Sequence, residues 1–554
     1  MELNLLYDTL QLSQLDRQTI GDLWEINNSD NNKEEFCCVL AVLFRQFSNG
    51  SLCLSFNADD EEMQIANEWR DTFAAGKKLF SSGSFSGVTA KACGDKTAFL
   101  PLVLRTLNSG EQLLYFYRCW KSEETLRRNL KLRLACSDNA AVHREINCPE
   151  EEGLEAKQKE AVRLVPDKNF LIVTGGPGTG KTYTAARMIK KTLRLHPDWK
   201  IALAAPTGKA AKRLEESLAL NGFSGLSGQT LHRLLGIRRG SVTAVYNHEN
   251  QLPYDLILID EISMVDIHLF SALLDAVSDE TRLILLGDNN QLPSVDAGSV
   301  LADLVYNSSS VDNSGWLCNL NASTVCLDTT RRTENEIMRS VFEKIKSGDV
   351  SVVNDFLQTE LSPVKFAVVP EDERESFAFL RNFLKEYIDN ADFAPNSDSQ
   401  NQTKILTVNR TGFWGCKNIN NMLEEYFGFQ RDGTPIIVTG NIYEQNLFNG
   451  DCGWLVGGKE KKMAVPDREA VSLRLLEGNY ETAFAVTIHK SQGSEYKNVI
   501  IILPPEENNA LLSREILYTG VTRAKEKITV IGRKSVFEAA LKRRIFRCSG
   551  LTKE

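Results

Sequence analysis

The sequence predicts an α/β protein built on parallel β-sheets that carry helices on both faces. From residue 170 onward, short runs of consecutive apolar residues alternate with longer segments of helical periodicity. These runs show little polar alternation, which is typical of parallel strands whose two faces are both buried. The first run leads directly into a glycine-rich loop that opens a helix.

The chain is long and mildly acidic. Its 554 residues carry 64 Lys and Arg against 73 Asp and Glu, a formal net charge of −9. At roughly 150 residues per domain, this length predicts three or four domains. The acidic balance excludes a uniformly basic nucleic-acid coat but allows a local basic channel. Since the longest apolar runs are far shorter than the roughly 20 residues that span a bilayer, we expect a cytoplasmic protein with no membrane partner.

The first 165 residues are expected to be mainly helical. Residues 35–46 (EFCCVLAVLFRQ) have the apolar pattern of a buried helix. Residues 114–165 are rich in Lys, Arg and Glu, and we predict that they are largely helical up to the glycine-rich loop. No catalytic spacing occurs before residue 115.

Apolar runs predict two α/β regions in the rest of the chain. Strands of the first are expected at residues 170–174, 201–206, 256–260 and 282–288. Strands of the second are expected at residues 404–409, 484–489 and 499–503. Polar stretches at 307–321 and 391–403 predict surface loops. Residues 434–482 hold short apolar strands punctuated by Asn-Gly and Gly, which predicts a small inserted β-barrel.

The glycine-rich loop has the sequence of a phosphate-binding loop. Residues 175–182 (GGPGTGKT) follow a strand and open a helix, so backbone N–H groups and the helix N-terminus can face phosphate oxygens. Lys181 is expected at the β- and γ-phosphates of ATP, and the Thr182 hydroxyl at Mg²⁺. The predicted nucleotide contacts of the loop are Gly176, Gly178, Thr179, Gly180, Lys181 and Thr182.

Two further strands end in polar residues that suit nucleotide hydrolysis. Asp260 and Glu261 follow the strand at 256–260; we assign Asp260 to Mg²⁺ and Glu261 to general-base activation of water. A solvated acidic pair is the alternative interpretation. Gln291 follows the strand at 282–288, and its amide can both donate to and accept from an attacking water or a γ-phosphate.

These motifs, with two later ones, resemble those of superfamily-one helicases in order and spacing. The later motifs are residues 487–495 (TIHKSQGSE) and 518–524 (YTGVTRA), and the resemblance covers about residues 150–540. Within the superfamily, the amino-acid sequence of these motifs is most similar to the RecD family, the alpha subunits of exodeoxyribonuclease V. The segments that carry this similarity are APTGKAAKRL (205–214), TLHRLLG (230–236), GDNNQLPSV (287–295) and LFNGDCG (447–453).

The resemblance implies the domain organisation. It implies two RecA-like P-loop motor domains, a small SH3-like β-barrel insertion and a mainly helical N-terminal domain. The expected ranges are 1–115 for an N-terminal partner-binding domain, 116–330 for the first motor domain, 331–433 with 483–554 for the second, and 434–482 for the barrel.

The resemblance also implies roles in nucleotide binding. Gln158 corresponds to a residue that hydrogen-bonds adenine, and Gly493 and Glu495 lie in the stretch expected near the ribose. Arg332 and Arg523 match two arginines with which the second motor domain stabilises the transferring phosphoryl group. Arg331 precedes Arg332 directly, so the choice between these two stays open.

A third set of residues falls in the motifs that line the DNA channel of such enzymes. Hydroxyls, backbone N–H groups and lysines there contact phosphates without reading bases. The expected DNA contacts are Pro206, Thr207, Lys209, Thr230, His232, Thr487 and His489. Phe413 and Trp414 either stack on bases or fill a core.

The function implied is that of an ATP- and Mg²⁺-dependent 5′-to-3′ translocase and helicase on single-stranded DNA. It would be the motor subunit of a helicase–nuclease complex in double-strand break repair, with the beta and gamma subunits of exodeoxyribonuclease V (RecB and RecC) as partners. The 5′-to-3′ direction rests on residues 292–298 (LPSVDAG), which contain none of the base-stacking aromatic residues of the 3′-to-5′ branch. We find no nuclease motif. The alternatives are a free-standing RecD-like helicase and an ATP-switched assembly protein.

Overall fold

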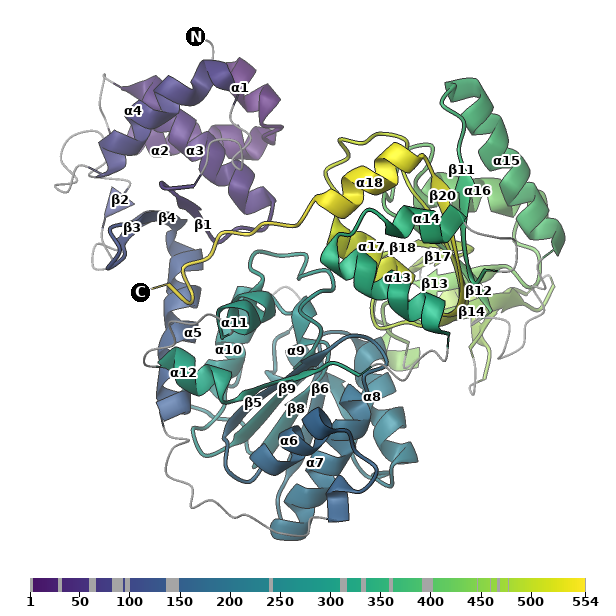
Figure 1. The fold of residues 1–554 in the computed structure, drawn as a ribbon, viewed down its shortest axis with the longest axis horizontal. Coiled ribbons are helices and arrows are strands. Elements are labelled where there is room, and N and C mark those ends of the chain that lie inside the picture. The colour runs from purple at the N-terminus through teal and green to yellow at the C-terminus, as the bar shows by residue number, and fades with distance from the viewer. Residues whose placement is uncertain are drawn as a thin grey trace.

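The computed structural model describes residues 3–553 apart from a set of short segments. The segments outside the description are 28–31, 59–65, 82–92, 95–99, 136–148, 239–242, 309–315, 330–334, 358–361, 391–401, 446, 459, 466–468 and 477. The described chain forms an N-terminal domain and two parallel α/β lobes, and the chain end returns from the second lobe to the N-terminal domain (Figure 1). Within the described ranges, every helix is too short or too polar to cross a bilayer.

The first lobe is a six-stranded parallel sheet. Its order is β10 (Thr324–Leu327), β5 (Phe170–Gly175), β9 (Arg282–Gly287), β8 (Leu256–Ile259), β6 (Ile201–Ala205) and β7 (Gly228–Thr230). The four predicted strands form the centre, while the short edge strands β7 and β10 were not predicted. Successive residues of a strand point to opposite faces. Leu171 of β5 packs against α6 (Ala156–Leu164), α7 (Lys181–Leu195) and α8 (Gly208–Leu220), whereas Ile172 packs against α5 (Tyr117–Ala135) and α10 (Ile267–Ala276).

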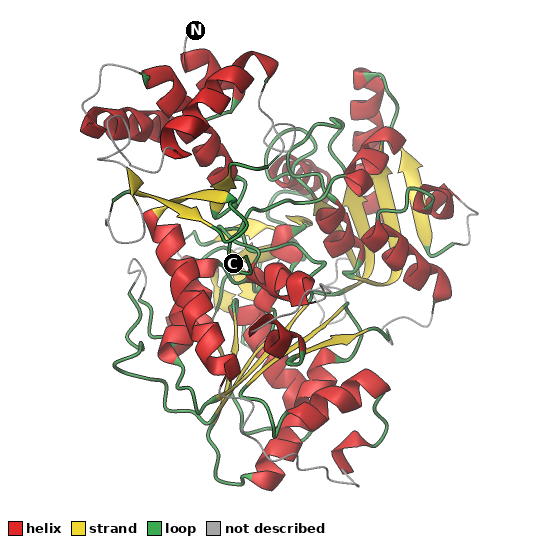
Figure 2. Cartoon of the chain, turned by 60° about the vertical axis from the view of Figure 1, so that its left-hand side comes forward, coloured by secondary structure: helices red, strands yellow, loops and turns green. Residues whose placement is uncertain are grey.

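The second lobe repeats this architecture with five parallel strands. Its order is β11 (Val364–Val368), β20 (Ala524–Gly532), β19 (Tyr496–Ile502), β12 (Thr403–Thr407) and β18 (Ala485–Thr487). One face is covered by α13 (Glu336–Ser347), α14 (Val352–Leu357), α17 (Arg514–Val521) and α18 (Lys534–Lys542). The other is covered by α15 (Glu373–Asn390) and α16 (Cys416–Phe427), so helices flank the sheet on both sides (Figure 2). Most of the polar loop predicted at 391–403 lies outside the described residues.

A small antiparallel sheet is inserted between β12 and β18. Its order is β16 (Val471–Ser472), β15 (Lys462–Ala464), β14 (Cys452–Val456), β13 (Pro435–Val438) and β17 (Tyr480–Thr482). The sheet has its own apolar core, which includes Ile436, Leu455 and Met463. Among the described residues, the edge strands β16 and β17 do not pair with each other. These strands occupy the range in which the β-barrel was predicted, and closure into an SH3-like barrel stays a prediction.

The N-terminal domain combines helices with a four-stranded sheet. The helices are α1 (Leu3–Thr9), α2 (Gln14–Asn27), α3 (Lys33–Ser48) and α4 (Arg70–Ser81). The sheet has the order β1 (Cys53–Ser55), β4 (Gln112–Phe116), β3 (Leu102–Thr106) and β2 (Cys93–Gly94), and we did not predict it. The predicted helix over 114–165 is wrong at its start, because Leu114 and Tyr115 pair with β1 and β3. The helix begins at Tyr117, where β4 ends.

A second correction concerns the predicted loop at 307–321. Helix α11 (Val300–Ser308) runs into this range and α12 (Trp316–Asn321) occupies its end, while residues 309–315 of the predicted loop lie outside the described residues. Trp316 and Leu320 lie four residues apart and are both buried in the core of the first lobe. An apolar pair at this spacing stabilises a helical turn against a core, despite the polar residues around it.

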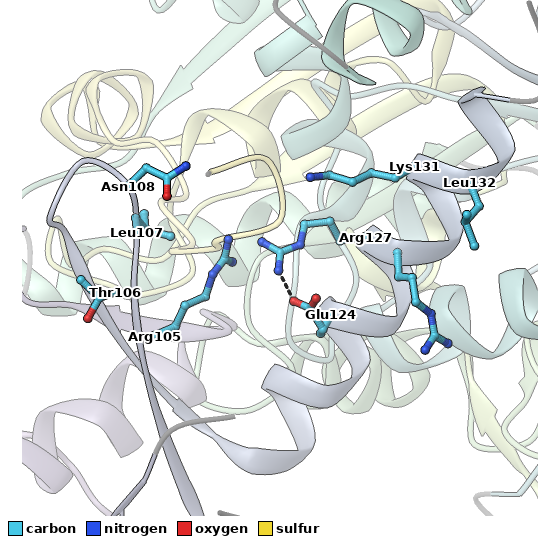
Figure 3. Close-up of a pocket in the computed structure, with 9 residues that line it drawn as sticks. Arg105, Thr106, Leu107, Asn108, Glu124, Arg127, Lys131 and Leu132 are labelled. Atoms are coloured by element: carbon cyan, nitrogen blue, oxygen red, sulfur yellow. Dashed lines mark hydrogen bonds and ion pairs between the residues drawn. The ribbon is translucent and has the colours of Figure 1, made fainter. Parts of the chain in front are cut away.

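The β3–β4 turn and α5 enclose a basic hollow of about 510 Å³ (Figure 3). Arg105, Arg127, Arg128 and Lys131 line it together with the single carboxylate of Glu124. Arg127 forms an ion pair with Glu124. Arg105 donates to the carbonyl oxygens of Gly550 (3.0 Å) and Lys553 (2.7 Å). Arg105, which lines this hollow, therefore holds the chain end in place.

The chain end joins all three parts of the molecule. After α18 it crosses from the second lobe to the N-terminal domain (Figure 1), where the Leu52 N–H donates to the Cys548 carbonyl oxygen (2.8 Å). The Gly550 N–H donates to the buried carboxylate of Glu123 (3.0 Å). Arg547 donates to the carbonyl oxygens of Ser294 (2.8 Å) and Gly298 (2.8 Å) in the first lobe. The domain range 483–554 thus includes a terminal segment that packs outside the second lobe.

Replacing Arg547 with alanine tests this junction. The substitution removes charge-assisted hydrogen bonds to the carbonyl oxygens of Ser294 and Gly298, although the Gly298 oxygen keeps the Ser294 hydroxyl as a donor. We therefore expect the free energy of unfolding to fall by roughly 2–3 kcal/mol. Differential scanning calorimetry should show an earlier unfolding transition. Lys542→Ala, at an exposed position of α18, removes a cation without touching the junction and should melt like the wild type. Equal melting of the two variants would contradict the structural role of Arg547.

Candidate functional site

The phosphate-binding loop lies between β5 and α7 in a conformation that requires glycine. Gly178 and Gly180 have φ values of 80° and 81°, which side chains with a Cβ rarely adopt. Lys181 donates its Nζ protons to the carbonyl oxygens of Gly175 (2.6 Å) and Gly176 (3.2 Å). The ammonium group is thus folded onto the loop, at the place where phosphate oxygens are expected.

The two acidic residues follow β8, which is separated by β9 from the strand β5 that leads into the loop. Asp260 Oδ1 accepts the Glu261 N–H (2.8 Å), and Glu261 has a φ of 55°, which is uncommon for a residue other than glycine. Strained backbone of this kind is found preferentially at functional sites. Burial, together with the neighbouring charge of Glu261, raises the pKa of Asp260 to about 6, against the lowering effect of Lys181.

These groups line one pocket of about 420 Å³ that both lobes form. The first lobe contributes Lys181, Thr182, Asp260, Glu261 and Gln291. The second lobe contributes Gly493, Glu495 and Arg523. Residues that are more than 300 positions apart therefore face one space, as the predicted roles require.

Gln291 connects the pocket to the second lobe. Its side chain is buried, and its Nε2 donates to Asp288 Oδ2 (3.1 Å). The next residue, Leu292, donates its N–H to Thr519 Oγ1 (3.0 Å), and its carbonyl oxygen accepts from Gln492 Nε2 (3.3 Å). A displacement at Gln291 is therefore transmitted directly to the second lobe.

Arg523 is buried at the start of β20. It donates to the carbonyl oxygens of Thr519 (3.0 Å) and Ser494 (3.3 Å). Burial lowers the pKa of its guanidinium group, while the charge of Glu261 opposes this effect. Arg332 and the alternative Arg331 lie outside the described residues, so their assignment stays a prediction.

Gln158 lies behind the loop rather than in the pocket lining. Its Nε2 donates to the Thr179 carbonyl oxygen (3.0 Å), and its Oε1 accepts the N–H of Glu155 (3.1 Å) at the start of α6. Both sides of the amide are thus occupied within the chain. One N–H donor and one acceptor site of the amide are still unused by these two bonds, and the predicted adenine contact stays a prediction.

Sequence reasoning missed Arg213, which is part of the pocket. It lies on α8, forms an ion pair with Glu495 and donates to the Gly493 carbonyl oxygen (2.8 Å). Its charge also interacts with those of Glu261 and Asp260. The segment APTGKAAKRL contains Arg213, but a basic residue on an amphipathic helix carries no signal of which element it faces.

The candidate DNA contacts lie at the C-terminal ends of strands. Thr207, Thr230 and Thr487 follow or end β6, β7 and β18, and each hydroxyl oxygen accepts a backbone N–H three residues on (3.2 Å in each case). Each hydroxyl proton then remains able to donate to a phosphate. Because β6 and β7 are adjacent, with Ala205 opposite Thr230, the first two threonines share one edge of the sheet.

The other DNA candidates differ in exposure. His232 is exposed, while Pro206 and Lys209 are half-buried beside Thr207. Burial and the charge of Arg547 lower the pKa of His489, which favours a neutral imidazole. Trp414 is buried and Phe413 packs against it and against Phe377, so both aromatic residues belong to a core. The base-stacking alternative for these two is therefore not supported.

The fold and the site together define the class. Two parallel α/β lobes face one pocket, which holds a phosphate-binding loop and an acid pair from one lobe and an arginine from the other. This arrangement is that of a P-loop nucleotide hydrolase with two motor lobes. Within the described ranges, no group of three or more His, Cys, Asp or Glu side chains is placed to hold a metal ion.

Comparison with known proteins agrees with this class. Residues 158–297 match the AAA domain model, and residues 482–531 match the UvrD-like helicase C-terminal domain. The RecBCD enzyme subunit RecD of Mycolicibacterium smegmatis is 33% identical over 551 residues, which cover 93% of this chain and 92% of that protein. The RecD subunit of Haemophilus influenzae is 33% identical over 522 residues, covering 79% and 80%. A crystal structure of Pif1 helicase from Bacteroides has a TM-score of 0.40 at 19% identity, covering 68% of this chain and 92% of that one.

The chain belongs to the RecD family. It is accordingly an ATP-dependent DNA helicase. The similarity extends through the N-terminal domain as well as the two lobes, since 93% of the chain is aligned.

Asp260→Asn tests the electrostatic cost of the acid pair in the nucleotide-free protein. The pKa of Asp260 is about 6 in the folded protein against an ordinary value of 3.8, so the folded state binds more protons in this interval and loses stability as the pH rises through it. Asparagine does not ionise. We therefore expect Asp260→Asn to have a higher free energy of unfolding than the wild type at about pH 8, with the difference nearly gone at about pH 4.

Denaturant titrations at the two pH values measure this difference. Asp279→Asn, at an exposed position in the first lobe, removes one carboxylate without changing the pocket and should follow the wild type. A stabilisation by Asp260→Asn of equal size at both pH values would contradict an ionisation effect.

Proposed function

We propose that this helicase uses ATP to move 5′ to 3′ along single-stranded DNA, as the motor subunit of a helicase–nuclease complex. The observation that carries the proposal is the pocket shared by the two lobes. A nucleotide bound between lobes favours their approach, and its hydrolysis releases them. Binding sites for one strand on both lobes would convert this cycle into stepwise movement.

The residues of the pocket suit hydrolysis of ATP. Lys181 would leave the carbonyl oxygens of Gly175 and Gly176 and bind the β- and γ-phosphates instead. Glu261 would accept a proton from the attacking water, and Gln291 would orient that water. Arg523 would stabilise the charge of the transferring phosphoryl group from the opposite lobe.

The pocket also fits Mg²⁺. The Asp260 carboxylate and the Thr182 hydroxyl are hard oxygen donors that line the same space, and Mg²⁺ prefers such donors. The raised pKa of Asp260 shows that its negative charge lacks full compensation in the chain alone. A bound Mg²⁺ would supply that compensation and neutralise charge on the phosphates.

Strand contacts are proposed at the neighbouring edge of both sheets. Thr207, Thr230 and Thr487 offer hydroxyl groups, and Lys209 offers a cation beside Thr207. Pro206, His232 and His489 complete this proposed set. Contacts of this kind bind phosphate and sugar, so we expect little sequence preference.

The proposed partners are the subunits that correspond to RecB and RecC. The relatives from Mycolicibacterium and Haemophilus are named as subunits of the RecBCD enzyme. The RecD2 helicase of Deinococcus radiodurans aligns with this chain over only 57% of its own length, at 28% identity. The alignments with the RecD subunits cover most of both proteins, whereas the alignment with RecD2 leaves much of RecD2 unmatched. This difference favours the interpretation of this chain as a subunit over that of a free-standing helicase. The N-terminal domain is the proposed partner-binding part, and the nuclease would belong to another subunit.

Variants of Lys181 and Glu261 separate binding from chemistry. Lys181→Ala removes the ammonium from the phosphates and should nearly abolish hydrolysis. Glu261→Gln keeps Asp260 and Thr182 for Mg²⁺, so nucleotide should bind while turnover falls by about 10²- to 10⁴-fold, the usual contribution of a general base. Fluorescence titration with a nucleotide analogue and steady-state ATPase assays measure the two steps. Near-normal turnover of Glu261→Gln would remove this residue from the base role.

Partial duplexes with one single-stranded tail test the direction of movement. The segment after Gln291 offers no aromatic residue to DNA: Leu292 is buried in the second-lobe core, and Ser294 is buried against Gly298. We therefore expect strand displacement on substrates with a 5′ tail and little on those with a 3′ tail. A blunt duplex and a Lys181→Ala protein serve as controls for tail-independent and ATP-independent separation. Unwinding confined to the 3′-tailed substrate would contradict the proposal.

A further inference from the structure

Helix α8 connects the proposed strand site to the nucleotide pocket. Its N-cap is Thr207, and Lys209 lies in its first turn. Arg213 follows Lys209 by four residues, so the two side chains lie about one turn, or roughly 6 Å, apart along the same face. A helix of this length does not bend over one turn, and a displacement of its N-terminus therefore moves Arg213.

The start of α8 packs against the inserted sheet region and the second lobe. Gly208 lies against Phe448 of the inserted sheet region, so close that a Cβ on Gly208 would be 3.0 Å from the Cβ of Phe448. Ala210 lies against Gly493, where a Cβ would be 3.7 Å from the Ala210 Cβ. The start of α8 is thus enclosed between the inserted sheet and the loop that carries Gly493 and Glu495.

The contacts of Arg213 make it a bridge between the lobes inside the pocket. One guanidinium nitrogen pairs with the Glu495 carboxylate and another donates to the Gly493 carbonyl oxygen (2.8 Å). Glu495 also pairs with Lys525 (3.2 Å), so its carboxylate lies between two cations. The planar guanidinium fork can serve both acceptors at once, which an ammonium group cannot do in the same geometry.

A bound nucleotide would lie beside this bridge. Arg213, Glu495 and Gly493 line the same space as Lys181 and Asp260, and Glu495 is the proposed ribose contact. A ribose hydroxyl that bonds to Glu495 would share its carboxylate oxygens with Arg213. The position of Arg213, which is set by α8, therefore influences how readily Glu495 accepts the nucleotide.

We propose that Arg213 is a positioning residue that couples strand binding at the start of α8 to ATP turnover. It does so by setting the position of Glu495 and the backbone at Gly493. The proposal rests on the proposed function, since it assumes that DNA contacts Thr207 and Lys209 and that ATP occupies the shared pocket. It assigns to one residue the coupling between these two sites.

Steady-state ATPase assays with and without oligo-dT, at saturating ATP, test this coupling in the full chain. The readout is the ratio of DNA-stimulated to basal turnover. We expect Arg213→Gln to lower this ratio about tenfold, a size usual for coupling between two sites. Arg213→Lys should restore part of the ratio, because it keeps the charge and one of the two bonds. Lys212→Gln, the matched control, removes the neighbouring exposed cation, which pairs only with Glu216 in the described chain, and should keep the wild-type ratio.

Two further measurements distinguish coupling from a structural or strand-contact role. Glu495→Gln should also lower the ratio, and the double variant Arg213→Gln/Glu495→Gln should be no worse than the single variants, because both act through one contact. Fluorescence anisotropy with labelled oligo-dT should give the Arg213→Gln protein a DNA affinity within about twofold of the wild type, because the Arg213 guanidinium group is bonded to Glu495 and to the Gly493 carbonyl oxygen inside the pocket.

The outcomes separate the inference from the proposed function. A wild-type protein without any DNA stimulation would contradict the proposed function and the coupling with it. A stimulated wild type together with an unchanged ratio in Arg213→Gln would overturn the coupling alone. A loss of DNA affinity in proportion to the loss of stimulation would make Arg213 a strand contact instead, and fully additive effects in the double variant would show that Glu495 is not its partner.

Discussion

Two carboxylates, those of Asp260 and Glu261, share a partly enclosed pocket, and the architecture depends on the cations that face them. Isolated charges in such surroundings are costly unless opposite charges compensate them. Lys181 belongs to the same lobe, but Arg523 comes from the other, and Arg213 reaches across to Glu495. The second lobe therefore supplies one of the cations that face these acids, and a nucleotide with its own charges would change the balance.

Among the described residues, few direct hydrogen bonds join the lobes near the pocket, and these involve the segments that carry the predicted site residues. Leu292 bonds to Thr519 and Gln492 directly after the predicted sensor Gln291. The chain end adds a second connection at a distance from the pocket, because Arg547 binds the carbonyl groups of residues 294–298 and Cys548 pairs with the N-terminal domain. A small number of specific contacts is compatible with the proposed separation and approach of the two lobes, because a large apolar interface between them would oppose that movement.

Parallel topology explains why the candidate nucleotide pocket and the proposed strand site lie so close together. Every strand of a parallel sheet ends at the same edge, so the loop after β5, the acids after β8 and the threonines after β6 and β7 converge without long connections. The inserted antiparallel sheet then reaches α8 through Phe448. Helix α8 thereby has one end at the proposed strand site and its next turn in the pocket.

The sequence by itself determined the chemistry that depends on neighbouring residues. The phosphate-binding loop needs glycines at 178 and 180 and a lysine at 181, and the acid pair needs only a buried strand before it. In the structure Gly178, Gly180, Lys181, Asp260 and Glu261 line one pocket, and their roles stay predictions. The central strands of both parallel sheets were predictable for the same reason, since burial on both faces leaves a continuous apolar run. The short strands β7, β10 and those of the N-terminal sheet carry too few residues for such a signal.

Only the tertiary structure decided which distant residues meet. Arg213 and Glu495 are separated by 282 positions, and the Arg105 contacts with the chain end by more than 440. No local pattern encodes which face of α8 meets the second lobe, that both sides of the Gln158 amide are occupied, or that Phe413 and Trp414 are in a core. The physical reason is that periodicity specifies that a side chain is buried or exposed, whereas its partner is chosen by the packing of whole elements.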